Sequence, residues 1–470
     1  MEKFLNKYFQ YIIYVMALSI TLLLLYQAKK SHLLPFPGQG TDQLSIIDAA
    51  VGMYYKKMPQ AGYKMSPGYT LFTYLLVVFS GAKLLLMRIF QAAIASLIPL
   101  FIYKLSRKLR MNFQSSQIAA LTYCFYGPAI LISLDFLRAS MLALSFLLFV
   151  YFMLSAFLKK KIGYYMLGGI FAGFTILGRE NFIPIVFLPL VVLFFRQYRR
   201  YITKKQIFTY LASLAAMLLP CIIYNYVNFN SFSIIPGNLN TVVGCYHGAG
   251  IEHMTDSSYR ARFLKNIPEQ FFKFISSYEI PNSLSFYAHK EVLEYMNIFI
   301  VPFNFILILA TFGLIKNIRN HKVIFIALLA VGYVGTMLYF NMFYRFRIPV
   351  VPLLTVLAGA GFYAVMRMKT RPQRTITWCG ILLLTWVTYS NPDHYRLPGE
   401  RVSVAKVLIQ NKRLLKAERY LDKLSLLSIF PVPVWVHLIR KYAESGDKTS
   451  ADRVYKKFLT LSRARNCKNK

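Results

Sequence analysis

Acidic residues and cysteines are both scarce in this chain of 470 residues. It contains 18 Asp and Glu against 55 Lys and Arg, and only five cysteines. Those cysteines show no metal-ligand spacing and no even disulfide framework, so we predict no metal site. Polar residues are scarce as well, because 56% of the chain is hydrophobic and the mean hydropathy is +0.45. A soluble domain of this length needs more polar surface, and the sequence therefore excludes that class.

Long apolar runs recur along the chain and predict an all-α polytopic membrane protein. Runs of about 17–25 residues have the length that a helix needs to cross the hydrocarbon core of a bilayer. We expect eleven such spans, at residues 8–26, 84–103, 115–133, 138–158, 162–177, 182–196, 206–226, 296–315, 322–341, 348–366 and 375–390. The first run is longer than a signal-peptide core and no small-residue cleavage site follows it, so we interpret it as a retained span.

Basic residues concentrate in alternate short loops, and this pattern predicts the orientation. The clusters lie at residues 104–110, 159–161, 196–205, 316–322 and 367–374. Because Lys and Arg mark the cytoplasmic loops of membrane proteins, we expect the N-terminus in the cytoplasm and the C-terminus outside. The excess positive charge then reflects topology and attraction to anionic membrane lipids, so we expect no nucleic-acid partner.

Three segments outside the predicted spans are long enough to fold. A first outer loop, residues 27–83, carries an apolar pattern at helical spacing over 43–57, which predicts a helix on the membrane surface. A large outer loop follows at 227–295. The tail, 391–470, reads as amphipathic helices, and its end is similar to a tetratricopeptide hairpin. We therefore divide the chain into a membrane domain, 1–390, and an external helical tail.

Eight ionisable residues fall at or just beyond the outer ends of the predicted spans. They are Asp42, Asp48, Asp135, Arg138, Arg179, Glu180, Arg345 and Arg347. Charges at this depth are costly unless they pair or line an aqueous cavity, although single arginines can also extend to the interface. A carboxylate can act as general base for an acceptor hydroxyl, and arginines can bind a phosphate leaving group. The set predicts a site for a polyprenyl-phosphate sugar.

Several stretches resemble one enzyme family. They are "SPGYTLFTYLL", "DFLRASMLALSFLLFVYFML", "GGIFAGFTILGRENFIPIVFLPLVVLFF", "LLPCIIYNYVNFNSFSIIPGNLNTVVGCYHGAG" and "YRFRIPVVPLLTVLAGAGF". In this order they resemble bacterial GT-C glycosyltransferases related to dolichyl-phosphate-mannose–protein mannosyltransferases. The resemblance implies an inverting sugar transfer in which a first-loop carboxylate is the key group. Asp42 and Asp48 both match that region, with Asp42 closer to the leading acid.

The sequence also departs from the family pattern. Gln43 stands where many relatives carry a second acid, and the second outer loop offers Asp135 in place of a glutamate. Asp42 follows Thr41, so a helix-capping role is an alternative to a role as base. We therefore name Asp42, Asp48 and Asp135 together as catalytic candidates and assign substrate binding to Glu180 and the four outer arginines.

These observations favour a glycosyltransferase in a bacterial plasma membrane. It would move a sugar from a polyprenyl-phosphate donor to a glycan, lipid or protein acceptor on the outer face. No cofactor is required by the sequence, although a divalent cation is possible. The alternatives are an oligosaccharide polymerase or ligase, a transporter, and a membrane anchor for the tail. A transporter is disfavoured because the spans show no internal duplication and no charge in mid-span.

Overall fold

The computed structural model consists of helices in the part of the chain that it describes. That part covers residues 2–31, 42–55, 66–191, 203–230, 232, 234, 257–280, 286–338, 342–388, 398–426 and 431–468. The chain divides into two compact units. Unit 1 comprises Met1–Leu22, Phe36–Glu279 and Phe299–Ser390, and unit 2 comprises Leu23–Pro35, Ile280–Ile298 and Asn391–Lys470.

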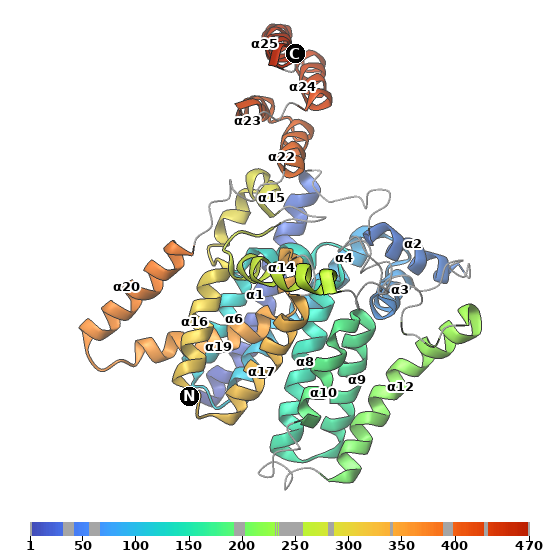
Figure 1. The fold of residues 1–470 in the computed structure, drawn as a ribbon, viewed down its shortest axis with the longest axis vertical. Coiled ribbons are helices and arrows are strands. Elements are labelled where there is room, and N and C mark those ends of the chain that lie inside the picture. Colours follow the sequence, from blue (N-terminus) through green and yellow to red (C-terminus); the bar gives the residue numbers. More distant parts are fainter. Residues whose placement is uncertain are drawn as a thin grey trace. The chain divides into compact units, whose positions relative to one another are not determined.

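Unit 1 contains the apolar helices. Helix α1 (Glu2–Lys30) begins in this unit and its last turns belong to unit 2. The others are α2 (Asp42–Tyr54), α3 (Pro67–Ser80), α4 (Leu84–Ala95), α5 (Leu97–Lys108), α6 (Phe113–Cys124), α7 (Gly127–Ser133), α8 (Arg138–Lys159), α9 (Ile162–Gly178), η1 (Glu180–Phe182), α10 (Ile183–Val191), α12 (Lys204–Phe229), α14 (Ser257–Ile275), α16 (Phe303–Lys316), α17 (His321–Met337), α18 (Tyr344–Arg347), α19 (Val351–Met366) and α20 (Arg371–Val387). Figure 1 shows α8, α9, α16, α17 and α19 side by side.

The polytopic membrane fold predicted from the sequence is confirmed. Five helices in the described residues are long and apolar enough to cross a bilayer, and five shorter apolar helices accompany them. Within the described residues, each of the eleven predicted spans coincides with one helix or with two consecutive helices. Residues 192–196, 339–341 and 389–390 of these spans lie outside the described part of the chain. The span 115–133 is divided into α6 and α7, and Pro128 is the second residue of α7. Proline has no N–H to donate and disfavours helical backbone in the residue before it.

Glycines allow two pairs of helices to pack backbone against backbone. A Cβ added at Gly313 of α16 would collide with the carbonyl oxygen of Leu357 and lie 2.7 Å from the Gly361 nitrogen of α19. Gly169 and Gly173 of α9 face α12 in the same manner. Small residues at such contacts are typical of membrane helix pairs, where van der Waals packing replaces the hydrophobic effect.

The Gly313 contact leads to a first prediction on stability. Gly313→Ala should lower the free energy of unfolding by about 1–3 kcal/mol, because overpacking forces the two backbones apart. Gly335 on α17 is the matched control, since nothing lies within 4 Å of an added Cβ there. Gly335→Ala should be neutral or stabilising by up to about 1 kcal/mol, the helix propensity difference between the two residues. Thermal unfolding in detergent measures both, and equal midpoints would contradict the packing model.

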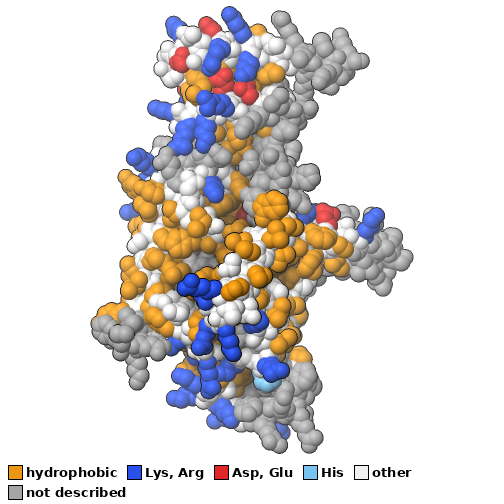
Figure 2. All heavy atoms as spheres, turned by 90° about the vertical axis from the view of Figure 1, so that its left-hand side faces the viewer, with side chains coloured by type: hydrophobic (Ala, Val, Ile, Leu, Met, Phe, Trp, Pro, Cys, Tyr) orange, Lys and Arg blue, Asp and Glu red, His pale blue; other side chains and the backbone are white. Residues whose placement is uncertain are grey.

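Basic side chains gather at one end of the helices in unit 1. Lys108 lies 4.3 Å from the Tyr151 ring centroid, and both Lys108 and Lys159 lie within 5.6 Å of the Tyr164 ring. Figure 2 shows Lys and Arg below a band of hydrophobic side chains. These lysines are in the clusters predicted for one membrane side. Arg138 lies at the other end of α8.

Unit 2 contains the tail helices. They are α22 (Pro398–Gln410), α23 (Leu414–Leu426), α24 (Val432–Glu444) and α25 (Lys448–Lys468), with α15 (Phe286–Val292) and η4 (Glu294–Ile298) from the large loop. Glu418 on α23 is 5% exposed and accepts hydrogen bonds from Arg453 at 2.8 Å and Tyr442 at 3.4 Å. A short turn joins α24 and α25, and Gly446 within it has a φ of +83°.

Candidate active site

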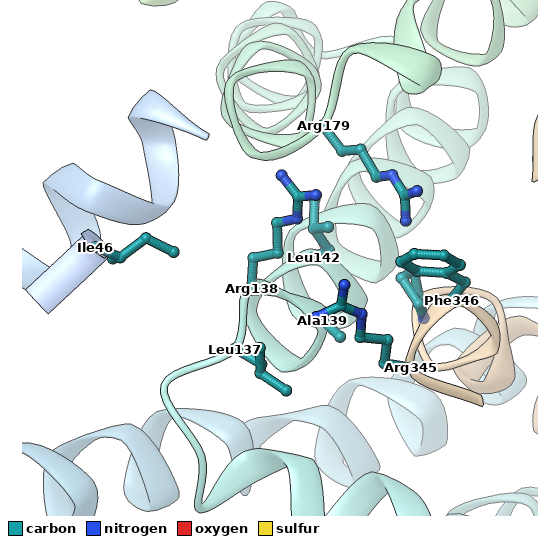
Figure 3. Close-up of a pocket in the computed structure, with 9 residues that line it drawn as sticks. Ile46, Leu137, Arg138, Ala139, Leu142, Arg179, Arg345 and Phe346 are labelled. Atoms are coloured by element: carbon teal, nitrogen blue, oxygen red, sulfur yellow. The ribbon is translucent and has the colours of Figure 1, made fainter. Parts of the chain in front are cut away.

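Three arginines that are far apart in the sequence line one pocket in unit 1. The pocket is lined by Ile46, Leu137, Arg138, Ala139, Leu142, Arg179, Arg345, Phe346 and Pro349. Its residues come from α2, the start of α8, the segment after α9, and α18 with the residues that follow it. Figure 3 shows the three guanidinium groups pointing toward one another. The structure therefore brings together Arg138, Arg179 and Arg345, all predicted from the sequence as substrate-binding residues.

Close packing of α8 against the end of α9 places the first two arginines. A Cβ added at Gly178, the last residue of α9, would lie 2.7 Å from the Leu142 side chain of α8. The chain then leaves the helix in extended conformation at Arg179, with φ −166° and ψ 123°. Arg138 is the first residue of α8, and its guanidinium donates a hydrogen bond to the hydroxyl of Ser66 before α3.

The Phe346 ring places the remaining arginine. The guanidinium carbon of Arg179 lies 4.1 Å from the ring centroid, and that of Arg345 lies 5.2 Å from it. Each contact of this kind contributes about 0.5–2 kcal/mol. The Phe346 carbonyl accepts a hydrogen bond from the Tyr333 hydroxyl at 2.7 Å, which fixes the turn that carries the ring. Phe346 thus holds two like charges in one pocket.

Glu180 adds a carboxyl group beside the arginines. Burial raises its pKa, while the nearby charges of Arg138 and Arg179 lower it. Three guanidinium groups repel one another, and the carboxyl groups of Glu180 and Asp135 offset part of that charge. The pocket is therefore suited to a ligand with negative charge, such as a phosphate, whose oxygens match the planar fork of arginine.

Arg347 lies elsewhere, although it is two residues from Arg345. Its side chain is fully buried and is not among the residues that line the pocket. It donates hydrogen bonds to the carbonyls of Lys273, Ser276 (2.9 Å) and Tyr278 (3.2 Å), and its Nη1 lies 3.5 Å from a Glu279 carboxylate oxygen. Residues two apart on a helical turn point about 200° from each other. The two arginines of "YRFR" therefore face different surroundings.

Glu279 is the buried partner of Arg347. The Tyr126 hydroxyl donates to its Oε1 at 2.9 Å. Burial raises the pKa of Glu279 to about 7, and Arg347 and Tyr126 act against that rise. The large outer loop is thereby joined to α18 through one buried ion pair.

Asp135 lies outside the pocket, in a buried hydrogen-bond network. It is 2% exposed, and its carboxylate accepts from Gln43 Nε2 at 2.7 Å and from the Phe136 backbone N–H at 2.9 Å. Its backbone carbonyl accepts from the Gln91 side chain at 2.5 Å. Burial raises the pKa of Asp135, while Gln43, Arg88, the Phe136 N–H and Arg345 lower it. This carboxylate holds α2 against the start of α8.

The two first-loop candidates differ in position. Asp42 begins α2, one helical turn before Ile46 of the pocket, and its side chain lies outside the described part of the chain. Asp48 is exposed, and helix geometry turns it about 200° from Ile46. Helix α2 covers most of the segment predicted as helical over 43–57, of which residues 56 and 57 lie outside the described part of the chain, and Asp42 is its first residue.

Sequence reasoning missed the groups that support these residues. Gln43 was noted only as a departure from the family pattern, and its bond to Asp135 spans 92 positions. Phe346, Tyr126 and Glu279 carried no signal beyond residue type. Among the described residues, no group of three or more His, Cys, Asp and Glu is arranged to hold a metal ion.

Comparison with protein families gives a match over part of the chain. Residues 64–224 match the family model described as dolichyl-phosphate-mannose-protein mannosyltransferase. The match confirms the resemblance to GT-C membrane glycosyltransferases. It covers α3 to most of α12, and so includes Arg138, Arg179 and Glu180 but neither α2 nor α18.

Solved structures show a more distant likeness. The crystal structure of ArnT from Cupriavidus metallidurans in the apo state is similar to this chain, with a TM-score of 0.46, 15% sequence identity, and coverage of 91% of this chain and 74% of that chain. The crystal structure of the same protein bound to undecaprenyl phosphate has a TM-score of 0.45 and 16% sequence identity to this chain. That match covers 91% of this chain and 75% of the other chain. No curated protein matches the sequence. The function proposed below rests on the family match and the site geometry.

Proposed function

We propose that this protein is a glycosyltransferase that moves one sugar from a polyprenyl-phosphate donor to an acceptor hydroxyl on the outer face of the membrane. The convergence of Arg138, Arg179 and Arg345 in one pocket is the observation that carries the proposal. The family match supports the same donor class, because dolichyl phosphate is a polyprenyl phosphate. The acceptor is a glycan, a lipid or a protein.

The arginine pocket suits the leaving group better than the donor. The acceptor oxygen forms a bond to the anomeric carbon while the bond from that carbon to the phosphate oxygen breaks. The electron pair of the broken bond stays on the phosphate oxygen. The donor diester has one negative charge, whereas the released monoester has about −1.5 to −2 at pH 7, as phosphate monoesters do. Positive groups fixed where charge develops stabilise the transition state more than the ground state.

The acceptor proton is assigned to Asp42. This residue begins α2 one turn before Ile46, whose side chain lines the pocket. We assign Asp135 to positioning, since its carboxylate is engaged with Gln43 and Phe136, and we assign no direct role to exposed Asp48. Glu180 lies close to Arg138 and Arg179 and is proposed to orient them or the acceptor.

A donor-consumption assay tests the function. Purified protein in nanodiscs would receive polyprenyl-phosphate sugars labelled in the sugar, together with membrane and periplasmic extracts as acceptor. We expect label to leave the donor and polyprenyl phosphate to appear in equal amount. Consumption of polyprenyl-diphosphate oligosaccharides instead would support the polymerase or ligase alternative. Absence of turnover with every donor of either class would contradict the proposal.

The outer-face assignment gives a topology prediction. Reporter fusions after Lys161 and after Glu400 should report opposite compartments, cytoplasmic for the first and external for the second. The reason is the basic loops, whose lysines gather at the end of α8 opposite to Arg138. A fusion after Arg371, in another basic loop, is the matched control and should agree with the first. An external signal at Lys161 would place the arginine pocket in the cytoplasm.

A further inference from the structure

A buried tether joins the large outer loop to the turn that carries Arg345. At one end is Arg347, which is 0% exposed and ends α18. At the other are the last turn of α14 and the residues after it, whose carbonyls at Lys273, Ser276 and Tyr278 accept the guanidinium N–H groups. Helix-terminal carbonyls have no intrahelical partner, so a cation there satisfies them and the helix dipole together.

Further contacts reinforce the tether on both sides. The Met342 backbone N–H donates to the Gln270 side chain at 2.8 Å, which joins α14 to the segment before α18. A Glu279 carboxyl oxygen lies 3.5 Å from the guanidinium, and Tyr126 at the start of α7 donates to Glu279. The Arg347 guanidinium carbon also lies 4.7 Å from the Phe303 ring centroid on α16. Arg347 therefore connects α14, α16 and α18.

We propose that Arg347 and Glu279 are positioning residues that set the direction of Arg345 and couple the large outer loop to the phosphate pocket. This inference rests on the proposed function, because it gives Arg345 the donor phosphate. The four residues of α18 form a single turn, so rotation of Arg347 about the helix axis rotates Arg345 by the same angle. A fixed Arg347 thus fixes Arg345 on the pocket side.

The contact pattern of Arg347 distinguishes positioning from phosphate binding. An arginine that binds phosphate presents a fork of two N–H groups to one anion. Arg347 instead makes separate bonds to three backbone carbonyls and a longer contact to one carboxylate. Lysine supplies three donors and a charge, so it can replace most of these point contacts but not a fork.

Two measurements test the proposal in nanodiscs, with activity expressed per folded protein. The first is donor kinetics of Arg347→Met, Arg347→Lys and Glu279→Gln. We expect Arg347→Met to lower kcat at least tenfold with donor KM within twofold, Arg347→Lys to recover most of kcat, and Glu279→Gln to lower kcat several-fold. The second needs no donor: amide exchange of residues 342–347 should speed up at least tenfold in Arg347→Met. Without the Arg347 bonds, this segment is held less firmly against α14, and the bond from the Met342 N–H to Gln270 opens more often.

The outcomes separate the alternatives. A tenfold rise in donor KM in Arg347→Met, without recovery in Arg347→Lys, would make Arg347 a phosphate ligand and overturn the proposal. Unchanged kcat per folded protein, with lowered thermal stability alone, would overturn it in favour of a scaffold role. If the wild-type protein consumes no polyprenyl-phosphate sugar, the proposed function fails, and amide exchange still decides whether the tether exists. Unchanged exchange in Arg347→Met would show that it does not.

Discussion

Replacing Asp42 by asparagine is expected to lower sugar transfer by about 10²–10⁴-fold, the usual contribution of a general base. The amide cannot accept the proton of the acceptor hydroxyl, while the size of the side chain and its ability to cap α2 are nearly unchanged. Donor binding should persist, because the arginines of the pocket are unaffected. Label release from the polyprenyl-phosphate donor at saturating acceptor measures the effect.

Asp48→Asn is the matched control for Asp42→Asn. Both changes remove one carboxylate from the same helix, but Asp48 is exposed and lies about 200° around the helix from Ile46. Its activity should stay within a few-fold of wild type. Near-normal turnover in Asp42→Asn would refute the first-loop base and direct attention to Glu180 and Asp135.

The Arg345→Ala variant should lose about 10²–10³-fold in kcat, comparable to the removal of one donor from an oxyanion-stabilising site. Donor KM should change by about twofold at most, because the charge that Arg345 stabilises develops mainly in the transition state. Arg345→Lys should recover only part of the loss, because an ammonium group lacks the planar fork. At Arg347, by contrast, the lysine variant is expected to recover most of kcat. Donor titration in nanodiscs gives both kinetic constants.

Arg367→Ala is the control for the arginine variants. Arg367 is exposed, follows α19, and lies 5.4 Å from the Tyr363 ring centroid, so its removal also deletes a cation–aromatic contact. It is in a basic loop and outside the pocket. Its variant should keep wild-type kinetics. If Arg345→Ala behaves like Arg367→Ala, the phosphate must be bound by Arg138 and Arg179 without Arg345.

The membrane helices could be predicted because their signal is local. A bilayer span needs a continuous apolar run, and α8 and α19 follow directly from such runs. The breaks between consecutive helices were harder to predict. Pro128 marks the start of α7, but the sequence does not show whether α6 ends before this proline or continues through it with a kink. Proline permits both outcomes, and the packing of the neighbours selects one.

The site could be predicted only as a list of residue types on one side of the membrane. Charge placement identified Arg138, Arg179 and Arg345 together with Arg347, but it gave no means of separating the last two. Their separation depends on where α18 begins, and that is set by contacts with Tyr333 and the end of α14. Long-range pairs such as Gln43 with Asp135 have no periodic signature and appear only in three dimensions.

The length of α8 has a consequence for how the donor is held. Its 22 residues extend about 33 Å at 1.5 Å per residue, close to the roughly 30 Å of a bilayer's hydrocarbon core. On the proposed function, Arg138 at its start is placed near the lipid head groups. A donor bound there keeps its polyprenyl chain among the acyl tails and avoids the cost of about 0.8 kcal/mol for each CH₂ moved into water. The protein needs to recognise only the head group, and the bilayer supplies both the retention of the chain and a high local concentration of donor.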